Sequence, residues 1–285
     1  MTQKLSSSGY VDVGGAEIYY ELRGSGPAVV FVHAGIADSG MWDEQFDTLS
    51  AEFSVVRYDM RNFGQTVAGE TAFADWEDLA AVMQKLAIES AFIVGASMGA
   101  TVAVELALER PELVRGLILV SPGIFPGHEP SGELRRGWSK LGQALDSGNT
   151  DRALDVELDM WVDRAGHRPT AVREAVRRRV RQMNARAYEL ASDAPNRKPL
   201  RPPALTRLKQ IAAPTLIVTG DRDMPDIATI AKRLERGIPS VQTVSVPDAA
   251  HMLNMEQPER FNELLLGFLH AHINSGPSTR VDDAG

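Results

Sequence analysis

Hydrophobic and polar residues follow one another along this chain in the patterns of buried strands and amphipathic helices. Residues 10–13 and 17–22 alternate in polarity on either side of a Gly-Gly turn, which predicts an antiparallel hairpin. The continuously apolar run 28–32 is typical of a strand buried on both faces. Next come predicted strands at 54–58, 91–94 and 116–120, separated by predicted helices at 41–49, 73–86 and 98–109.

The same alternation returns near the end of the chain. Strands are predicted at 215–219 and 241–246, and helices at 227–236 and 258–271. Parallel strands joined by helices need right-handed crossovers, which place helices on both sides of the sheet. We therefore expect an α/β fold with a mostly parallel central sheet and helices on both faces.

Residues 122–200 interrupt the alternation and lack strand signals. Within 172–187 an apolar residue recurs every three to four positions with arginines between, which predicts an amphipathic helix. The segment is more basic than acidic, whereas the rest of the chain is strongly acidic. We interpret the arginines as a solvated face, with substrate steering and docking onto the acidic core as the alternatives. The polar stretch 274–285 is expected to be a disordered tail.

Composition narrows the class of protein. The chain has 285 residues, of which 44% are hydrophobic and 24% charged, as in folded globular proteins. It has no cysteine, which excludes disulfides, thiolate metal sites and a cysteine nucleophile. A formal net charge of −8 disfavours a nucleic-acid partner. The sequence shows neither a signal peptide nor a membrane span, so we expect a cytoplasmic protein with a small-molecule substrate; a homodimer is compatible with it.

One pentapeptide, Gly95–Gly99, carries the strongest functional signal. It reads Gly-Ala-Ser-Met-Gly and lies directly between a predicted strand and a predicted helix. So sharp a turn brings the flanking backbones close together, so that the positions two before and two after Ser97 must lack bulky side chains. The turn holds Ser97 in a strained conformation with its hydroxyl lifted clear of the sheet. Ser97 is the predicted nucleophile; a capping serine at a glycine-rich helix entry is the alternative.

A serine hydroxyl needs a base, usually a histidine oriented by a carboxylate. In the chain order serine, acid, base, the base follows the late strands. His270 and His272 lie inside the last predicted helix, whereas His251 lies in a loop after the strand 241–246. Such loops collect active-site groups in parallel sheets, so His251 is the predicted general base. An ordinary loop histidine is the alternative.

The acid is expected in the loop 220–226, which holds three aspartates. Asp223 lies far enough along this turn to reach over the strand end toward His251 and is the predicted acid. Asp226 is the main alternative, and Asp221 is a weaker one. The two aspartates that do not serve are expected to be solvated surface charges.

The oxyanion that forms during acyl transfer needs two backbone N–H donors. One is the amide of Met98, the residue after the nucleophile, at the start of a helix. The loop after the strand that ends near His33 should supply the second, and Gly35 is the predicted donor because it lets substrate approach. A plain turn glycine is the alternative. We expect His33 to brace this loop rather than react.

These residues together resemble the α/β-hydrolase fold superfamily, in its lidded serine esterase-like branch. The resemblance covers roughly residues 9–273 and rests on five segments, which are 31–35, 58–64, 95–99, 220–223 and 250–251. It implies a triad of Ser97, Asp223 and His251, with no cofactor and no metal. It also implies a core formed by 1–121 and 201–273, with 122–200 as a helical lid.

Two positions depart from the family pattern. Members usually have His-Gly where this chain has His33-Ala34, and Arg-Gly where it has Arg61-Asn62. The Ala34 methyl group could tighten or tilt the oxyanion loop. Asn62 tolerates left-handed backbone conformations better than most residues and can replace glycine at such a turn.

The expected activity is that of a serine hydrolase that cleaves a carboxylic ester or lactone through an acyl-enzyme. Use of the same triad for C–C bond hydrolysis or perhydrolysis is the first alternative, and a non-catalytic ligand-binding protein is the second. Apolar side chains in the lid and the site loops would line the pocket, although core packing is the commoner role of such residues. The candidates for the substrate pocket are Ile36, Phe125, Trp138, Trp161 and Met252.

Overall fold

The computed structural model describes residues 5–69, 71–163, 170–190 and 197–274. An eight-stranded sheet has the strand order β1-β2-β4-β3-β5-β6-β7-β8. Its strands are β1 (Leu5–Val13), β2 (Ala16–Gly24), β3 (Ala28–Val32), β4 (Ser54–Tyr58), β5 (Ala91–Ala96), β6 (Val114–Val120), β7 (Thr215–Gly220) and β8 (Val241–Val246). The β1–β2 and β2–β4 pairs are antiparallel and the remaining pairs are parallel. The expected α/β fold with a mostly parallel sheet is therefore confirmed.

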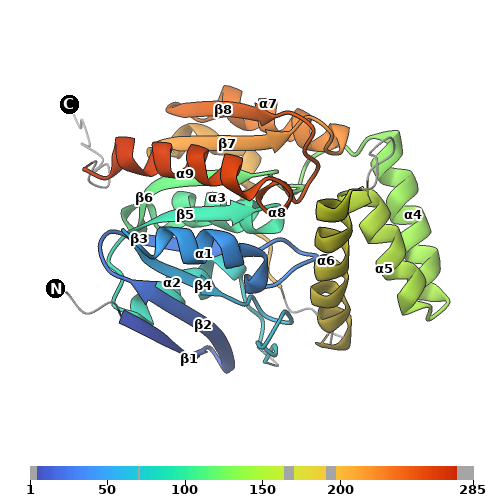
Figure 1. Cartoon of the computed structure of the whole chain (residues 1–285), viewed down its shortest axis with the longest axis horizontal. Helices are drawn as coiled ribbons and strands as arrows, with labels where there is room; N and C mark the ends of the chain where they lie inside the picture. Colours follow the sequence, from blue (N-terminus) through green and yellow to red (C-terminus); the bar gives the residue numbers. More distant parts are fainter. Residues whose placement is uncertain (1–4, 70, 164–169, 191–196, 275–285) are drawn as a thin grey trace.

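Helices cover both faces of this sheet (Figure 1). One face carries α1 (Asp43–Leu49), α8 (Leu253–Glu256) and α9 (Pro258–His272), and the other carries α2 (Asp75–Lys85), α3 (Met98–Glu109) and α7 (Pro225–Gly237). Successive strand residues point to opposite faces, so Val29 and Phe31 pack toward α1 and α9 while Val30 and Val32 pack toward α2 and α3. Continuous apolar strands are required because neither face meets water.

Short 3₁₀ helices complete the connections between these elements. They are η1 (Ser39–Trp42), η2 (Pro111–Leu113), η4 (Ala204–Thr206) and η5 (Leu208–Gln210). Among the described residues no helix is long and apolar enough to cross a membrane.

The segment between β6 and η4 contains helices joined by turns and coil in its described part, and we call residues 122–200 the helical insertion. It contains α4 (Gly132–Asp146), α5 (Thr150–Leu158), the π-helical turn η3 (Asp159–Asp163) and α6 (Ala171–Leu190). The amphipathic helix predicted at 172–187 is thus confirmed. Figure 1 shows α6 standing beside the end of the sheet where the parallel strands finish.

The arginines of α6 are paired rather than simply solvated. Arg173 lies 3.0 Å from Asp248 and Arg179 lies 3.3 Å from Asp43, so both form ion pairs with the core. Three more have polar partners, namely Arg177 with Asp163, Arg181 with Asp155 and Arg186 with the Gly64 carbonyl. Our interpretation of a solvated arginine face was wrong for Arg173, which is only 15% exposed, whereas Arg179 and Arg186 are 45% and 47% exposed and stay solvated while paired. Opposite charges on the core and on α5 and η3 draw the helix into place.

The predicted disordered tail at 274–285 lies, beyond Asn274, outside the described residues.

Candidate active site

Ser97 occupies the sharp bend between β5 and α3. Its backbone angles are φ 52° and ψ −114°, a conformation that residues other than glycine rarely adopt. A Cβ added at Gly95 would lie 2.2 Å from the Gly99 carbonyl oxygen, and one added at Gly99 would lie 2.2 Å from the Val32 carbonyl oxygen. The expected crowding and backbone strain are therefore both present.

Asp223 and His251 meet across the ends of two adjacent parallel strands, β7 and β8. The His251 Nδ1 atom lies 2.9 Å from Oδ2 and 3.0 Å from Oδ1 of Asp223, and the side chains are only 2% and 3% exposed. An ionised carboxylate only accepts hydrogen bonds, so Nδ1 donates and Nε2 is left as the basic nitrogen. The Trp161 ring lies 4.6 Å from the imidazole, which limits how the histidine can turn.

The other two aspartates of this loop have separate partners. Asp221 accepts a hydrogen bond from the Asp248 amide at the surface. Asp226 was expected to be a surface charge, but it is 2% exposed, so that expectation was wrong. It binds His128 Nε2 at 2.8 Å and accepts hydrogen bonds from the amide and hydroxyl of Ser131, which caps α4. These bonds lower the pKa of Asp226 against the effect of its burial. Asp226 thus fastens the start of the helical insertion to the core.

Glu256 is a second buried carboxyl beside the acid–base pair, and it was missed in the sequence. The Ala250 amide donates to both of its oxygens, at 3.1 and 3.2 Å, so Glu256 holds the residue next to His251. The Arg173 Nε atom lies 3.9 Å from it. Burial raises the pKa of Glu256 to about 7, an effect that the Ala250 amide and Arg173 oppose. A carboxyl buried by tertiary packing leaves no signal in the local sequence.

The two residues that carry the predicted oxyanion donors, Gly35 and Met98, lie close together. A Cβ placed on Gly35 would lie 3.5 to 3.7 Å from atoms of the Met98 side chain. The loop of Gly35 is held by His33, whose Nε2 accepts from the Met60 amide at 3.0 Å while its Nδ1 lies 2.8 Å from the Ala34 carbonyl. Burial lowers the pKa of this histidine, which keeps it neutral and suits it to bracing the loop.

The second departure from the family pattern has a structural explanation. Asn62 has φ 67°, the left-handed conformation that glycine would otherwise supply. Its neighbour Arg61 forms a buried two-pronged ion pair with Asp78, with distances of 2.7 and 2.8 Å. This pair fixes the loop that faces Gly35.

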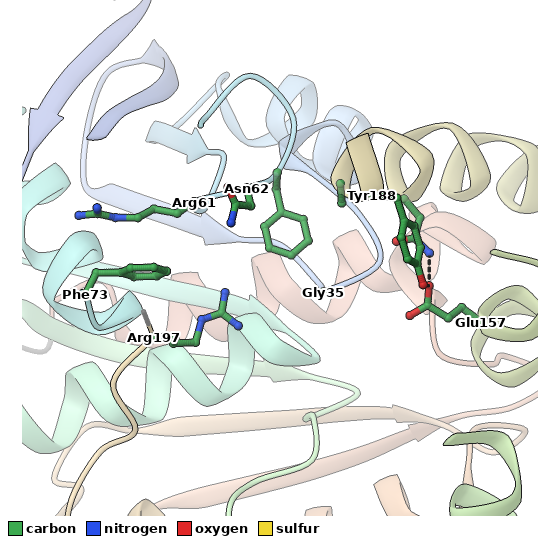
Figure 2. Close-up of a pocket in the computed structure, with 10 residues that line it drawn as sticks. Gly35, Arg61, Asn62, Phe73, Glu157, Tyr188 and Arg197 are labelled. Carbon is green, nitrogen blue, oxygen red and sulfur yellow. Dashed lines mark hydrogen bonds between the residues drawn. The ribbon is translucent and has the colours of Figure 1, made fainter. Parts of the chain in front are cut away.

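Two cavities flank the predicted oxyanion donors. The first, which we call the Gly35 cavity, measures about 300 Å³, and its lining residues are Gly35, Arg61, Asn62, Phe63, Phe73, Glu157, Asn184, Ala187, Tyr188 and Arg197 (Figure 2). The second, the Ser97 cavity, measures about 560 Å³, and its lining residues are Asp75, Ser97, Met98, Thr101, Val102, Glu105, Ile124, Pro126, Arg197, Lys198 and Pro199. The seryl hydroxyl therefore borders a space large enough for a small substrate.

The five predicted pocket residues have different surroundings. Trp161 contacts His251, whereas Phe125 and Met252 are buried in the hydrophobic core and Ile36 is 7% exposed. Trp138 is 42% exposed on α4. Neither lining set includes any of the five.

Polar side chains of the helical insertion form the far wall of the Gly35 cavity. Glu157 of α5 accepts hydrogen bonds from the Asn184 amide group at 2.6 Å and from the Tyr188 hydroxyl at 2.9 Å, both from α6. Burial raises the pKa of Glu157 despite these donors. The sequence does not single out Glu157, Asn184 or Arg197, because the cavity joins segments that are far apart along the chain.

No group of three or more histidines and carboxylates within the described ranges is arranged to hold a metal ion. The described cavities are lined by side chains suited to a small organic substrate.

Comparison with known proteins agrees with this architecture. Residues 29–264 match the model of the alpha/beta hydrolase family, and the chain belongs to that family. It is 26% identical to 3-oxoadipate enol-lactonase 1 of Acinetobacter baylyi, over 85% of this chain and 88% of the relative. It is also 26% identical to 2-(acetamidomethylene)succinate hydrolase of Mesorhizobium japonicum, over 92% of this chain and 94% of the relative.

Solved structures share the fold over nearly the whole chain. Est816, an N-acyl homoserine lactone degrading enzyme, superposes with a TM-score of 0.73 at 25% identity, over 91% of this chain and 99% of its own. A thermophilic esterase from Thermogutta terrifontis gives a TM-score of 0.74 at 24% identity, over 95% of this chain and 100% of its own, which shows the fold alone.

Proposed function

We propose that this protein is a serine hydrolase that cleaves a carboxylic ester or lactone of a small molecule through an acyl-enzyme. The observation that carries the proposal is the buried Asp223–His251 hydrogen bond, at the same sheet edge as the strained Ser97. The family membership supports it, as do a lactonase among the sequence relatives and a lactone-degrading enzyme among the structural neighbours.

The chemistry follows from the roles of the three side chains. Ser97 Oγ attacks the substrate carbonyl carbon while its proton passes to His251 Nε2, and the carbonyl oxygen becomes an oxyanion held by the amides of Met98 and Gly35. Collapse of this intermediate breaks the bond to the leaving alkoxide, which takes the proton from Nε2. Water then attacks the acyl carbon and gives one proton to Nε2. As this second tetrahedral intermediate collapses, the bond between the acyl carbon and Ser97 Oγ breaks, Oγ takes the proton from Nε2, and the acid is released.

The helical insertion acts as a lid in this proposal, with the hydrolase core formed by 1–121 and 201–273. Its polar residues Glu157, Asn184 and Tyr188 wall the Gly35 cavity opposite the oxyanion donors, which supports a role in substrate selection. A cytoplasmic location and a small-molecule substrate remain part of the same proposal.

The test is a Ser97→Ala variant assayed on p-nitrophenyl esters and lactones of rising chain length. Turnover should fall by roughly 10³-fold or more, because the nucleophile is gone while the oxyanion donors remain. A fluorophosphonate should add its mass to Ser97 in the wild type. Ser139→Ala, a change on α4, is the matched control and should keep wild-type turnover. An alanine variant at position 97 that kept its rate would refute the proposal.

A further inference from the structure

Arg197 stands where the two cavities meet. It is the residue that lines both the Gly35 cavity and the Ser97 cavity. Its Nη1 atom lies 3.4 Å from the Met98 sulfur, and Met98 is in turn the neighbour of Gly35. A cation thereby contacts the side chain of Met98, whose amide is one of the predicted oxyanion donors.

Within the described residues, the side chain of Arg197 contacts Phe73, Asp75 and Met98. Its backbone pairs with Phe73, and its Nε atom lies 2.8 Å from Asp75 Oδ2. The guanidinium centre lies 5.7 Å from the centre of the Phe73 ring. These contacts occupy Nε and Nη1, and within the described part of the chain no acceptor is recorded for Nη2. The side chain is 39% exposed, so a molecule in the cavities can reach it.

The charges around Arg197 leave room for an anion. Arg61 pairs with Asp78 and Arg197 pairs with Asp75, so the charge balance that remains at the Ser97 cavity is that of Lys198 against Glu105. Lys198 and Glu105 also line the Ser97 cavity. Burial raises the pKa of Glu105 to about 7, so much of this carboxyl is protonated near neutral pH.

The opposite wall of the Gly35 cavity carries a carboxyl group instead of a cation. Figure 2 shows Arg197 and Glu157 on opposite sides of the space in front of Gly35. Glu157 presents a carboxyl there, whose oxygen already accepts two hydrogen bonds. An anionic group is therefore favoured at the Arg197 end and disfavoured at the Glu157 end, which orients a substrate that carries one.

We propose that Arg197 binds a carboxylate on the substrate, so that the enzyme selects esters or lactones that bear a carboxylate a short distance from the scissile carbonyl. This inference rests on the proposed function. An arginine suits the task because its planar fork matches a carboxylate, and a charge-assisted hydrogen bond is stronger than a neutral one. Arg197 acts in recognition, and the chemical step stays with the triad.

The experiment compares two esters of equal chain length, p-nitrophenyl hexanoate and mono-p-nitrophenyl adipate, with the uncatalysed rate subtracted. Wild type should give the higher kcat/KM on the adipate ester. Arg197→Gln should lower kcat/KM on the adipate ester roughly 10- to 100-fold, because a hydrogen bond to a charged group is lost, and change the hexanoate ester little. Arg197→Lys should fall between the two, since it keeps the charge without the fork.

A second pair of esters shows which side of the substrate carries the anion. In 4-carboxyphenyl hexanoate the carboxylate sits on the leaving group instead of the acyl chain, and phenyl hexanoate is its neutral counterpart. For each pair we take the ratio of kcat/KM on the anionic ester to kcat/KM on the neutral ester. The pair whose ratio falls in Arg197→Gln shows whether the carboxylate belongs on the acyl chain or on the leaving group. Arg135→Gln is the control, because Arg135 is an exposed arginine of α4 paired with Glu129. It should leave both ratios at the wild-type value.

Three results would overturn the inference: a wild type that prefers the neutral ester in both pairs, unchanged ratios in Arg197→Gln, or an equal drop in Arg135→Gln. The first needs no variant and holds even if Arg197→Gln fails to fold. Failure of the proposed function looks different, since turnover of the hexanoate ester would then not depend on Ser97 at all.

Discussion

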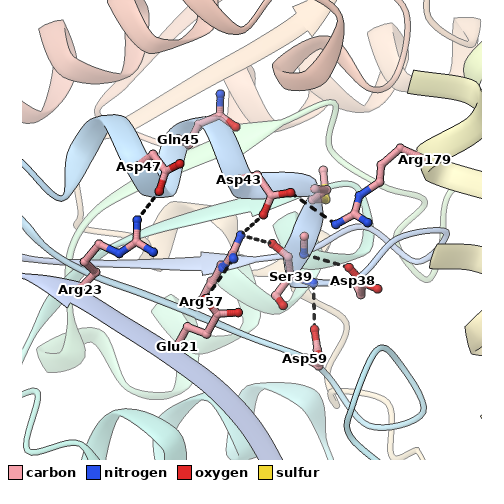
Figure 3. A network of polar contacts seen from close by, with 12 residues as sticks. Glu21, Arg23, Asp38, Ser39, Asp43, Gln45, Asp47, Arg57, Asp59 and Arg179 are labelled. Atoms are coloured by element: carbon pink, nitrogen blue, oxygen red, sulfur yellow. Dashed lines mark hydrogen bonds and ion pairs between the residues drawn. The ribbon is translucent and has the colours of Figure 1, made fainter. Parts of the chain in front are cut away.

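The carboxyl edge of the sheet and the helical insertion hold their polar side chains in opposite ways. At the sheet edge the Asp223 and His251 side chains are 3% and 2% exposed and bind each other. On the insertion side the pair of Arg179 with Asp43 is 45% and 54% exposed (Figure 3). Buried pairs depend strongly on each partner, whereas exposed pairs are screened by water and salt.

This difference suits the sheet edge to the proposed catalytic step and the insertion to substrate selection. In the proposed mechanism, a change at the sheet edge removes a group that no other residue replaces, so we expect a large effect on rate. Apart from the buried contacts of Asp226 with His128 and Ser131, the insertion is held to the core by ion pairs that are partly or largely exposed, so we expect its inner wall to vary without loss of the fold. We expect the insertion, with Glu157 and Tyr188 on that wall, to set substrate preference.

Two aspartates three positions apart, Asp223 and Asp226, should affect the protein in different ways. Asp223→Asn should lower kcat by about 10³- to 10⁴-fold, because an amide favours the wrong tautomer of His251. Asp226→Asn should instead destabilise the protein by about 1–3 kcal/mol, because a buried charged acceptor for His128 and Ser131 is lost. Turnover measured at saturating substrate and urea denaturation of both variants would check this.

The two variants are each other's controls, since each removes one carboxylate near the start of α7. Equal effects of the two changes on kcat would contradict the assignment of Asp223 as the acid. A loss of stability in Asp223→Asn as large as that in Asp226→Asn would weaken the separation of roles.

Glu256 gives a pH-dependent test at the sheet edge. Its pKa is raised to about 7, so its contribution to stability is fully present below its ordinary pKa of 4.5 and is lost as pH rises through 7. Glu256→Gln removes this titration while its carbonyl oxygen still accepts from the Ala250 amide. Relative to that variant, the free energy of unfolding of wild type should fall by up to about 3 kcal/mol from pH 4.5 to pH 8.

Urea denaturation at a series of pH values measures this difference. Glu263→Gln, in which the lost carboxylate is exposed and paired with Arg260, is the matched control and should run parallel to wild type. If the free energy of unfolding of Glu256→Gln also changed with pH in parallel with wild type, the pKa of the Glu256 carboxyl would not be raised.

The sequence predicts those features of this molecule that depend on interactions between residues close together along the chain. The strand, turn and helix around Ser97 follow from apolar periodicity and two glycines that backbone crowding requires. The partners of Asp226 could not be read in the same way, because His128 and Ser131 lie more than 90 positions away and meet it only in the folded chain. The same holds for Arg197, which reaches the cavities through its pairing with Phe73.

The partners of the α6 arginines were not predicted for a related reason, since an amphipathic pattern shows which face of a helix is polar but not which residues that face contacts. Their partners come from the core, from α5 and from η3. Whether an aspartate is a surface charge or an anchor therefore depends on tertiary contacts.

The smallest expected effect lies in the network that Figure 3 shows, where Arg179 of α6 meets Asp43 of the core. Asp43 also lies 2.6 Å from Arg57, which holds it in place without Arg179. Arg179→Gln should therefore lower the free energy of unfolding by less than about 1 kcal/mol, and by still less in concentrated salt. A double-mutant cycle with Asp43→Asn, measured by urea denaturation at low and high salt, isolates the pair. A coupling energy well above that value, or one that salt leaves unchanged, would mean that Arg179 and Asp43 interact as a buried ion pair rather than as an exposed one.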